Sequence, residues 1–171
     1  MRFETDQLAA LSRVAELLDR HGFEYWVFGG WAVDFHAGAV TWEHDDVDIA
    51  VWAEDDDRIT AVLLADGWRH APEEGEDGFT GYERQGVKLE VAFLARAENG
   101  EVYTPLREGR GSWPTGAFED DVAELRGVRA RVVSLRALKA DKSEVRDEAL
   151  VAAKDRADVA TLSRLAGPRD V

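Results

Sequence analysis

Cysteine is absent from the chain, and this absence limits the chemistry that the protein can perform. It excludes disulfide bonds and thiolate metal sites, and it fits a protein that works in a reducing cytoplasm. Any metal ion would have to be bound through oxygen or through imidazole nitrogen. A metal site in this protein is therefore expected to be built largely from carboxylates.

Long apolar runs are also missing. No stretch reaches the roughly 20 apolar residues that a membrane-spanning helix needs. Residues 1–20 are amphipathic and acidic, and they lack the unbroken apolar segment of a secretion signal. We therefore expect neither secretion nor membrane anchoring, and we predict a cytoplasmic location.

Positive charge is scarce. The chain has 21 Lys and Arg against 35 Asp and Glu, a formal net charge of −14. Such a field repels phosphate backbones, which argues against nucleic acid as a partner, and it attracts cations such as a polycationic small molecule. The alternative is that the acidic surface only keeps the protein soluble, and net charge alone does not choose between these interpretations.

The length of the chain is typical of one domain. Its 171 residues lie within the usual range of about 50 to 250. We predict a core at residues 1–133 and a helical extension at 134–171 that packs on the core, so that the whole forms one compact domain. Within the extension, Ser134 is a candidate N-cap and apolar residues at helical spacing predict two helices.

The first part of the chain alternates between helix and strand patterns. Apolar residues at helical spacing predict an opening helix that ends near Gly22. The run EYWVF then predicts a strand, and it leads into Gly29 and Gly30 before a short helix that Gly38 closes. A Gly-rich turn at a helix N-terminus exposes backbone N–H groups and the positive end of the helix dipole. This turn is therefore a candidate site for a triphosphate.

Two carboxylates occupy alternate positions in and beside the segment VDIAVWA, which alternates as a strand does. Asp46 and Asp48 share one face, while the opposite face is apolar. At about 7 Å apart along a strand, two such groups in a cleft repel each other unless a cation neutralises them or one takes a proton. We predict that they bind magnesium, with manganese as the alternative metal. The rival interpretation is a pair of solvated acids on an exposed strand.

Glu90 is the third candidate ligand. It lies in the segment VKLEVAFL, where a carboxylate in a mostly apolar strand needs a reason. If this strand neighbours the strand of Asp48, Glu90 completes the three-carboxylate arrangement that two metal ions use in phosphoryl transfer. The rival interpretation is an exposed acid paired with a neighbouring Lys or Arg. Adjacency of the two strands is the hypothesis that the structure must test.

The remaining segments are predicted from the same signals. We expect a helix over residues 54–67 and a meander of strands within 68–94, interrupted by an acidic loop at 73–78. This loop is either an acceptor contact or a solvated hairpin tip. The stretch 99–116 is rich in Gly and Pro and is predicted to be irregular apart from an edge strand at EVYT. A further strand is predicted at VRARVVS.

Two polar residues near the Asp pair are open to more than one interpretation. His44 could hydrogen-bond a metal-ligand carboxylate, or it could cap backbone groups in the turn. Asp34 could cap or form a salt bridge as easily as it could bind a ligand.

The stretch GGWAVDFHAGAVTWEHDDVDIAV resembles the core signature of bacterial aminoglycoside 2″-nucleotidyltransferases and lincosamide nucleotidyltransferases, which belong to the DNA-polymerase-β-type superfamily. In these families a Gly pair, a short helix, a turn with Thr and His, and D-x-D occur in this order. The resemblance continues weakly through Glu90 and returns in LRALKADK and KDRADVATL. It implies an α/β (α+β) fold, with a polymerase-β-like core whose mixed twisted sheet is flanked by helices, followed by C-terminal helices.

The resemblance also implies roles for individual residues. Gly29 and Gly30 would bind the triphosphate, Asp46 and Asp48 would hold magnesium, and Glu90 would be the third acid, which takes the proton of the acceptor hydroxyl. In this chain that acid is Glu rather than the more usual Asp.

A second departure from the family concerns positive charge. Trp42 stands where relatives often have Arg, so one contact to phosphate is replaced. We expect lysines of the extension to restore positive charge near the phosphates, and the candidates are Lys139, Lys142 and Lys154.

The activity that the resemblance implies is the magnesium-dependent transfer of a nucleoside monophosphate from ATP or another nucleoside triphosphate to a hydroxyl of a small acceptor, with release of pyrophosphate. An aminoglycoside-type antibiotic is a candidate acceptor, because a cationic drug suits the negative chain. Two alternatives stay open. One is a toxin-like nucleotidyltransferase that acts on tRNA or protein, and the other is a non-catalytic module that binds nucleotide or metal.

Overall fold

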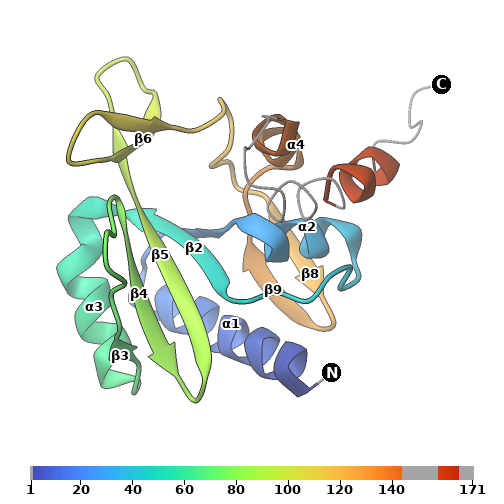
Figure 1. Ribbon diagram of the computed structural model, residues 1–171, viewed down its shortest axis with the longest axis horizontal. Helices are drawn as coiled ribbons and strands as arrows, with labels where there is room; N and C mark the ends of the chain where they lie inside the picture. The colour runs from blue at the N-terminus through green and yellow to red at the C-terminus, as the bar shows by residue number, and fades with distance from the viewer. Residues whose placement is uncertain (1, 144–157, 166–171) are drawn as a thin grey trace.

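A computed structural model describes residues 2–143 and 158–165 of the chain. Within these residues a mixed sheet of seven strands runs in the order β1-β2-β5-β4-β3, with β6 paired to β5 and β7 paired to β6 (Figure 1). A separate ribbon pairs β8 with β9. The strands are β1 (Tyr25–Val27), β2 (Val47–Trp52), β3 (Arg69–His70), β4 (Phe79–Arg84), β5 (Val87–Arg96), β6 (Val102–Pro105), β7 (Arg110–Ser112), β8 (Val122–Leu125) and β9 (Val128–Arg131).

The helices of this part of the chain flank the sheet, as the sequence predicts. They are α1 (Arg2–His21), α2 (Gly29–Ala37), the short 3-10 helix η1 (Ala53–Asp55), α3 (Asp56–Ala65) and α4 (Leu135–Ser143), with a further helical segment at 158–165. None of the described helices is both long and apolar enough to cross a membrane.

The two strands that carry the candidate ligands are neighbours. Strands β2 and β5 pair in parallel, and the register places Asp48 directly opposite Glu90. Because side chains alternate across a strand, both carboxylates then project from the same face of the sheet. The adjacency hypothesis is confirmed.

The core lies mainly against the opposite face of the same strands. Ile49, Val51, Leu89 and Val91 are fully buried there. In Figure 1, α1 passes behind the strands, and it contacts both β5 and α3. The amphipathic pattern of α1 explains this packing, because its apolar side supplies Leu11, Val14 and Leu18 to the same core.

The prediction of an irregular stretch over 99–116 is partly wrong. EVYT does contribute to a strand, β6, but β6 is not at the edge of the sheet, because a second strand, β7, folds back on it and pairs Tyr103 with Ser112. The indole Nε1 of Trp113 donates to Thr104 Oγ1 at 2.9 Å and fixes the end of this hairpin. The sequence also gave no prediction for β8, which pairs with β9. Both missed strands are short, and their pairing rather than their residue pattern defines them.

The predicted N-cap at Ser134 is confirmed, because its Oγ accepts a hydrogen bond from the backbone N–H of Ala137 at 3.3 Å. Helix α4 packs against α2, and Leu138 and Leu162 are buried, as the predicted apolar faces require. Lys154 and Val151, an apolar residue of the predicted second helix, lie outside the described residues. The division into a core at 1–133 and an extension at 134–171 stays a prediction.

Candidate active site

Three carboxylates converge on one face of the sheet. Asp46 lies at the end of the turn that leads into β2, Asp48 is the second residue of β2, and Glu90 is in the middle of β5. One carboxylate oxygen from each lies within 4.8 Å of the corresponding oxygens of the other two, and all three side chains are half-buried. The structure thus brings together the three predicted ligands.

The electrostatics of this cluster are unfavourable without a cation. Partial burial, and after it the nearby negative charges of Asp46, Glu73 and Glu76, together raise the pKa of Glu90 from 4.5 to about 7. Both causes disfavour the charged carboxylate. Glu90 therefore carries an electrostatic strain that a bound cation would relieve.

The donor set fits a hard divalent cation. All three ligands offer carboxylate oxygen, which magnesium and manganese prefer, and neither thiolate nor imidazole takes part. Because two of these oxygens come from paired strands, their separation is fixed by the register of the sheet rather than by a mobile loop.

Gly29 and Gly30 begin helix α2 immediately beside the cluster. Gly29 has a φ of 64°, and a Cβ atom added there would collide with Oδ2 of Asp48. The backbone N–H of Phe28 also donates to the carbonyl of Asp48 at 3.1 Å. A helix N-terminus and a carboxylate of the cluster are therefore in direct contact, which explains why position 29 must be glycine.

His44 and Asp34 form a buried pair, which agrees with the salt-bridge interpretation of Asp34. Nε2 of His44 lies 2.6 Å from Oδ2 of Asp34. Asp34 therefore holds the His44 ring in place. Sequence reasoning did not single out this pair, although a charged residue inside the otherwise apolar helix GGWAVDFHA was a signal.

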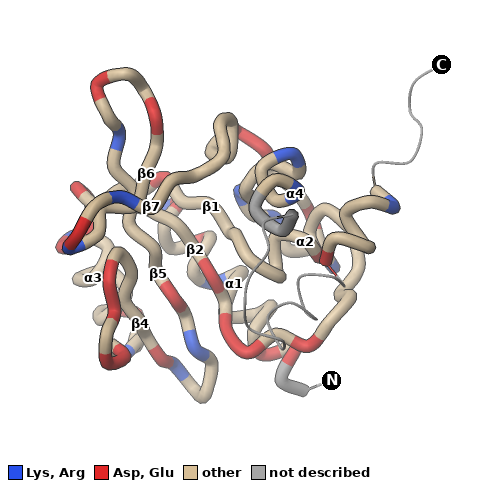
Figure 2. The backbone as a smooth tube through the Cα atoms, turned by 45° about the horizontal axis from the view of Figure 1, so that its top comes forward, with Lys and Arg blue, Asp and Glu red and all other residues tan. Residues whose placement is uncertain are grey.

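The acidic loop before β4 approaches the cluster. Glu73 and Glu76 contribute to the raised pKa of Glu90, and Glu73 also pairs with Lys88 at 3.3 Å. Figure 2 shows acidic positions on the turn before β2, on β5 and along the neighbouring hairpin. A small cavity of about 60 Å³ has Asp46, Glu73 and Glu90 in its lining. This loop is not a remote hairpin tip.

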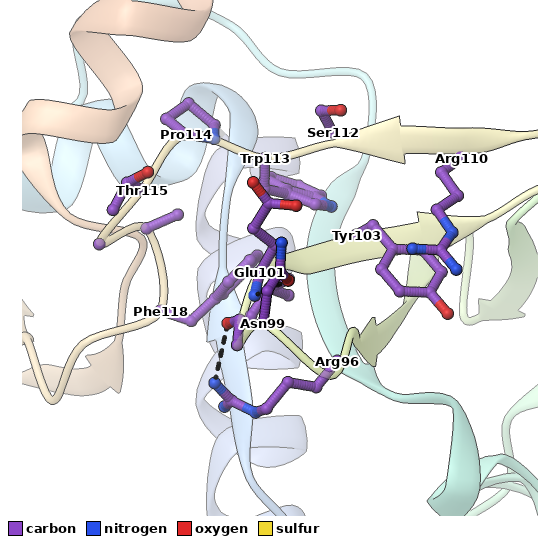
Figure 3. Close-up of a pocket in the computed structure, with 14 residues that line it drawn as sticks. Arg96, Asn99, Glu101, Tyr103, Arg110, Ser112, Trp113, Pro114, Thr115 and Phe118 are labelled. Carbon is purple, nitrogen blue, oxygen red and sulfur yellow. Dashed lines mark hydrogen bonds between the residues drawn. The ribbon is translucent and has the colours of Figure 1, made fainter.

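A second, larger cavity of about 390 Å³ lies under the β6–β7 hairpin and shares no lining residue with the first. Trp113 and Phe118 lie together in its wall, with Tyr103 and Arg110 on the other side (Figure 3). The ring of Trp113 also packs edge-on against Phe28, with centroids 5.4 Å apart. Since Phe28 precedes the Gly pair, Trp113 supports the Gly turn.

The structure describes only some of the lysines that are predicted to lie near the phosphates. Lys139 lies on α4, a helix that borders α2, and is partly buried. Lys142 is near the end of the same helix, and its side chain lies outside the described atoms, as does Lys154. Trp42 is exposed in the turn between α2 and β2. The roles of Lys139 and Lys142 therefore stay predictions.

Comparison with known proteins connects this geometry to a family. The model of the family described as aminoglycoside-2″-adenylyltransferase matches residues 10–162 of the chain. A 2″-aminoglycoside nucleotidyltransferase of Escherichia coli is 32% identical over 76 residues, which are 44% of this chain and 42% of that relative. The aligned part thus spans less than half of the relative's length.

Solved structures show the same fold at low sequence identity. The antibiotic-resistance factor ANT(2″)-Ia superposes with a TM-score of 0.70 at 21% identity, over 94% of this chain and 89% of its own. The lincosamide antibiotic adenylyltransferase LnuA, bound to lincomycin, gives a TM-score of 0.70 at 18% identity, over 91% and 95% of the two chains. The predicted polymerase-β-type fold is thereby confirmed.

Proposed function

The chain belongs to the aminoglycoside-2″-adenylyltransferase family, and we propose that it transfers a nucleoside monophosphate from a nucleoside triphosphate to a hydroxyl of a cationic antibiotic, with release of pyrophosphate. ATP is the expected nucleotide and an aminoglycoside the expected acceptor, in keeping with the names of the family and of its curated relatives.

One observation carries this proposal: the carboxylate of Asp48 lies against the backbone of Gly29, at the first residue of α2. The proposed site for divalent cations and the proposed site for phosphate are thus adjacent. A solvated acidic patch would not need a glycine of positive φ packed against one of its carboxylates.

Each part of the site has a role in this reaction. The N–H groups at the start of α2 bind the phosphates and orient the α-phosphorus for attack. A divalent cation held by Asp46, Asp48 and Glu90 would polarise the phosphate oxygens and neutralise their charge. The acceptor oxygen forms the new bond to the α-phosphorus, pyrophosphate leaves, and Glu90 takes the proton of the hydroxyl.

The acceptor is proposed to enter over the acidic loop. Glu73 lines the small cavity together with Asp46 and Glu90, so an ammonium group beside the reacting hydroxyl would meet negative charge. The net charge of −14 adds long-range attraction for a polycation and repulsion for tRNA.

The test is pyrophosphate release from each of the four ribonucleoside triphosphates with magnesium, against panels of aminoglycosides and lincosamides. We expect acceptor-dependent release in the wild type and none in Asp46→Ala. Mass spectrometry of the acceptor should show the gain of one nucleoside monophosphate.

Other outcomes would redirect the proposal. Magnesium-dependent nucleotide binding with no release across the panel would contradict a small cationic acceptor. Modification of tRNA or of a protein would then identify a macromolecular acceptor, and its absence would leave a binding module. Release that persists in Asp46→Ala would contradict the assigned site.

A further inference from the structure

The turn between α2 and β2 is held by a buried polar cluster that the proposed reaction does not use. Asp34 is 0% exposed. Its Oδ1 accepts hydrogen bonds from the backbone N–H of Thr41 at 2.9 Å and from Thr41 Oγ1 at 2.5 Å. Its Oδ2 contacts Nε2 of His44 at 2.6 Å. One carboxylate on α2 thus ties down two points of the turn that delivers Asp46.

His44 is fixed from three further directions. Its ring packs on Trp31 with centroids 4.7 Å apart. A Cβ atom added at Gly30 would lie only 2.5 Å from two atoms of the same ring, so the imidazole fills the space that glycine leaves open. The carbonyl of His44 accepts a hydrogen bond from Nε2 of Gln7, itself buried on α1, at 2.9 Å.

These contacts affect the distance between the N-terminus of α2 and the turn that carries Asp46. Gly30 belongs to the first turn of α2, and Asp46 follows His44 by two residues, at most about 7 Å of chain. A shift of the His44 ring therefore moves Asp46 relative to the helix N-terminus. The ring acts as a spacer between the phosphate-binding amides and the metal ligands.

We propose that Asp34 and His44 are positioning residues, which hold Asp46 and Asp48 at the separation from α2 at which a divalent cation and a nucleoside triphosphate bind together. This inference rests on the proposed function. It predicts that the pair controls the joint affinity for metal and nucleotide, beyond any effect on folding.

A merely structural role predicts something different. Breaking a buried pair by removing one partner lowers stability wherever the pair is located. His36 offers a matched control. It lies on α2, the helix that carries Asp34, and its Nε2 contacts the carbonyl of Val133 at 2.9 Å. Both histidines tie α2 to another segment, but only His44 ties it to the turn that carries Asp46.

The experiment measures binding of Mn²⁺ by the free-ion signal in electron paramagnetic resonance, with a non-hydrolysable ATP analogue and without acceptor. Temperature is kept below the unfolding transition of every variant. We expect His44→Ala to weaken Mn²⁺ binding by about 10- to 100-fold, the usual loss when a residue that orients metal ligands is removed. His36→Ala should bind as the wild type does, although its Tm falls.

Conservative substitutions of His44 distinguish a positioning role from a packing role. In His44→Gln the amide Nε2 can replace the imidazole Nε2 as donor to Asp34, so we expect most of the Mn²⁺ affinity to return. In His44→Asn the shorter amide cannot reach Oδ2 of Asp34, and affinity should stay low. If His44→Ala does not fold, the Gln and Asn variants make the same comparison. In steady-state assays the KM for nucleotide should rise more than kcat falls.

Each outcome is decisive. Equal Mn²⁺ and nucleotide affinity in the wild type and in His44→Asn, with a lowered Tm, would show a structural pair and overturn the inference. A wild type that binds neither Mn²⁺ nor nucleotide would instead contradict the proposed function, and with it the premise of this inference.

Discussion

The two faces of strands β2 and β5 have opposite roles although they share one backbone. The front face carries Asp48 and Glu90, which are half-buried. The back face carries Ile49, Val51, Leu89 and Val91, none more than 1% exposed. Since a one-residue slip of register would exchange the two sets, the same pairing that buries the core also assembles the site.

The two faces contribute differently to the stability of the protein. Burial of the back-face side chains removes apolar surface from water, at about 25 cal/mol per Å². The front face instead brings like charges together, and this repulsion is one cause of the raised pKa of Glu90. Substitutions on the front should therefore remove function without loss of stability, and those on the back should do the reverse.

The largest effect is expected from Asp48→Asn, which removes the charge of a proposed metal ligand from the front face. We expect kcat/KM to fall by more than about a hundredfold, because removing a single transition-state contact already has that effect. The Tm of the metal-free protein should not fall, since one of the repelling charges is gone. Steady-state kinetics and calorimetry measure the two quantities.

Asp45→Asn is the matched control, because Asp45 is an exposed acid just before the cluster. It should keep near-normal activity. If Asp48→Asn kept full activity, or if both variants lost it equally, Asp48 could not be a specific ligand.

The sequence predicts those features of this architecture that depend on neighbouring residues better than those that depend on contacts between distant segments. The period-two alternation around Asp48 and Glu90 is local, so both strands and their polar faces were predicted correctly. Their adjacency was only a hypothesis, because nothing in either segment encodes its partner.

The buried pair of Asp34 and His44 was not predicted. Asp34 is on a helix and His44 is in a turn, and only the folding of that turn over α2 brings their atoms to 2.6 Å. Similarly, β7 is a strand because it pairs with β6, and its own residues Arg110–Ser112 carry no strand pattern. Contacts between segments of weak local preference lie beyond sequence reasoning of this kind.

The back face is tested by Ile49→Ala. Ile49 is fully buried between the two front-face positions 48 and 50, and truncation of such a side chain costs about 2–5 kcal/mol of the free energy of unfolding. Urea unfolding measures this loss, and kcat per folded molecule should stay within about twofold of the wild type. Leu64→Ala, at an exposed position of α3, should change stability little. Equal losses in both variants would contradict the assigned core.

A smaller effect is expected from Glu90→Gln in metal-free protein. The folded-state pKa of Glu90 is about 7, above its ordinary value of 4.5, so the folded protein binds the proton more tightly than the unfolded chain. Wild-type stability should therefore fall, relative to Glu90→Gln, as pH rises from about 4.5 to 7, and the difference should be constant above that. The Tm of Glu90→Gln should exceed that of the wild type at pH 8 and approach it at pH 4.5.

Glu83→Gln is the control for this pH dependence. Glu83 lies on β4 and pairs with Arg69 at 2.7 Å, so its charge is compensated. It should gain no stability at pH 8. A pH-independent difference between Glu90→Gln and the wild type would contradict the raised pKa.

The smallest effect is expected from Lys88→Ala, at the rim of the front face. Lys88 and Glu73 line the small cavity and pair at 3.3 Å, and both side chains are largely exposed. Loss of the lysine leaves Glu73 uncompensated beside the proposed path of a cationic acceptor. We expect the KM for an aminoglycoside to fall roughly two- to threefold at low salt, with stability changed by less than about 0.5 kcal/mol.

The salt dependence and a matched variant identify the cause of this change. At an ionic strength of about 0.5 M, screening between exposed charges should abolish most of the gain. Arg58→Ala removes the same charge from an exposed position of α3, where Arg58 pairs with Asp55 of η1 at 3.0 Å, outside the lining of that cavity. Equal gains in both variants would mean that only net charge attracts the acceptor, whereas a gain confined to Lys88→Ala would assign the attraction to the front face and to Glu73 in particular.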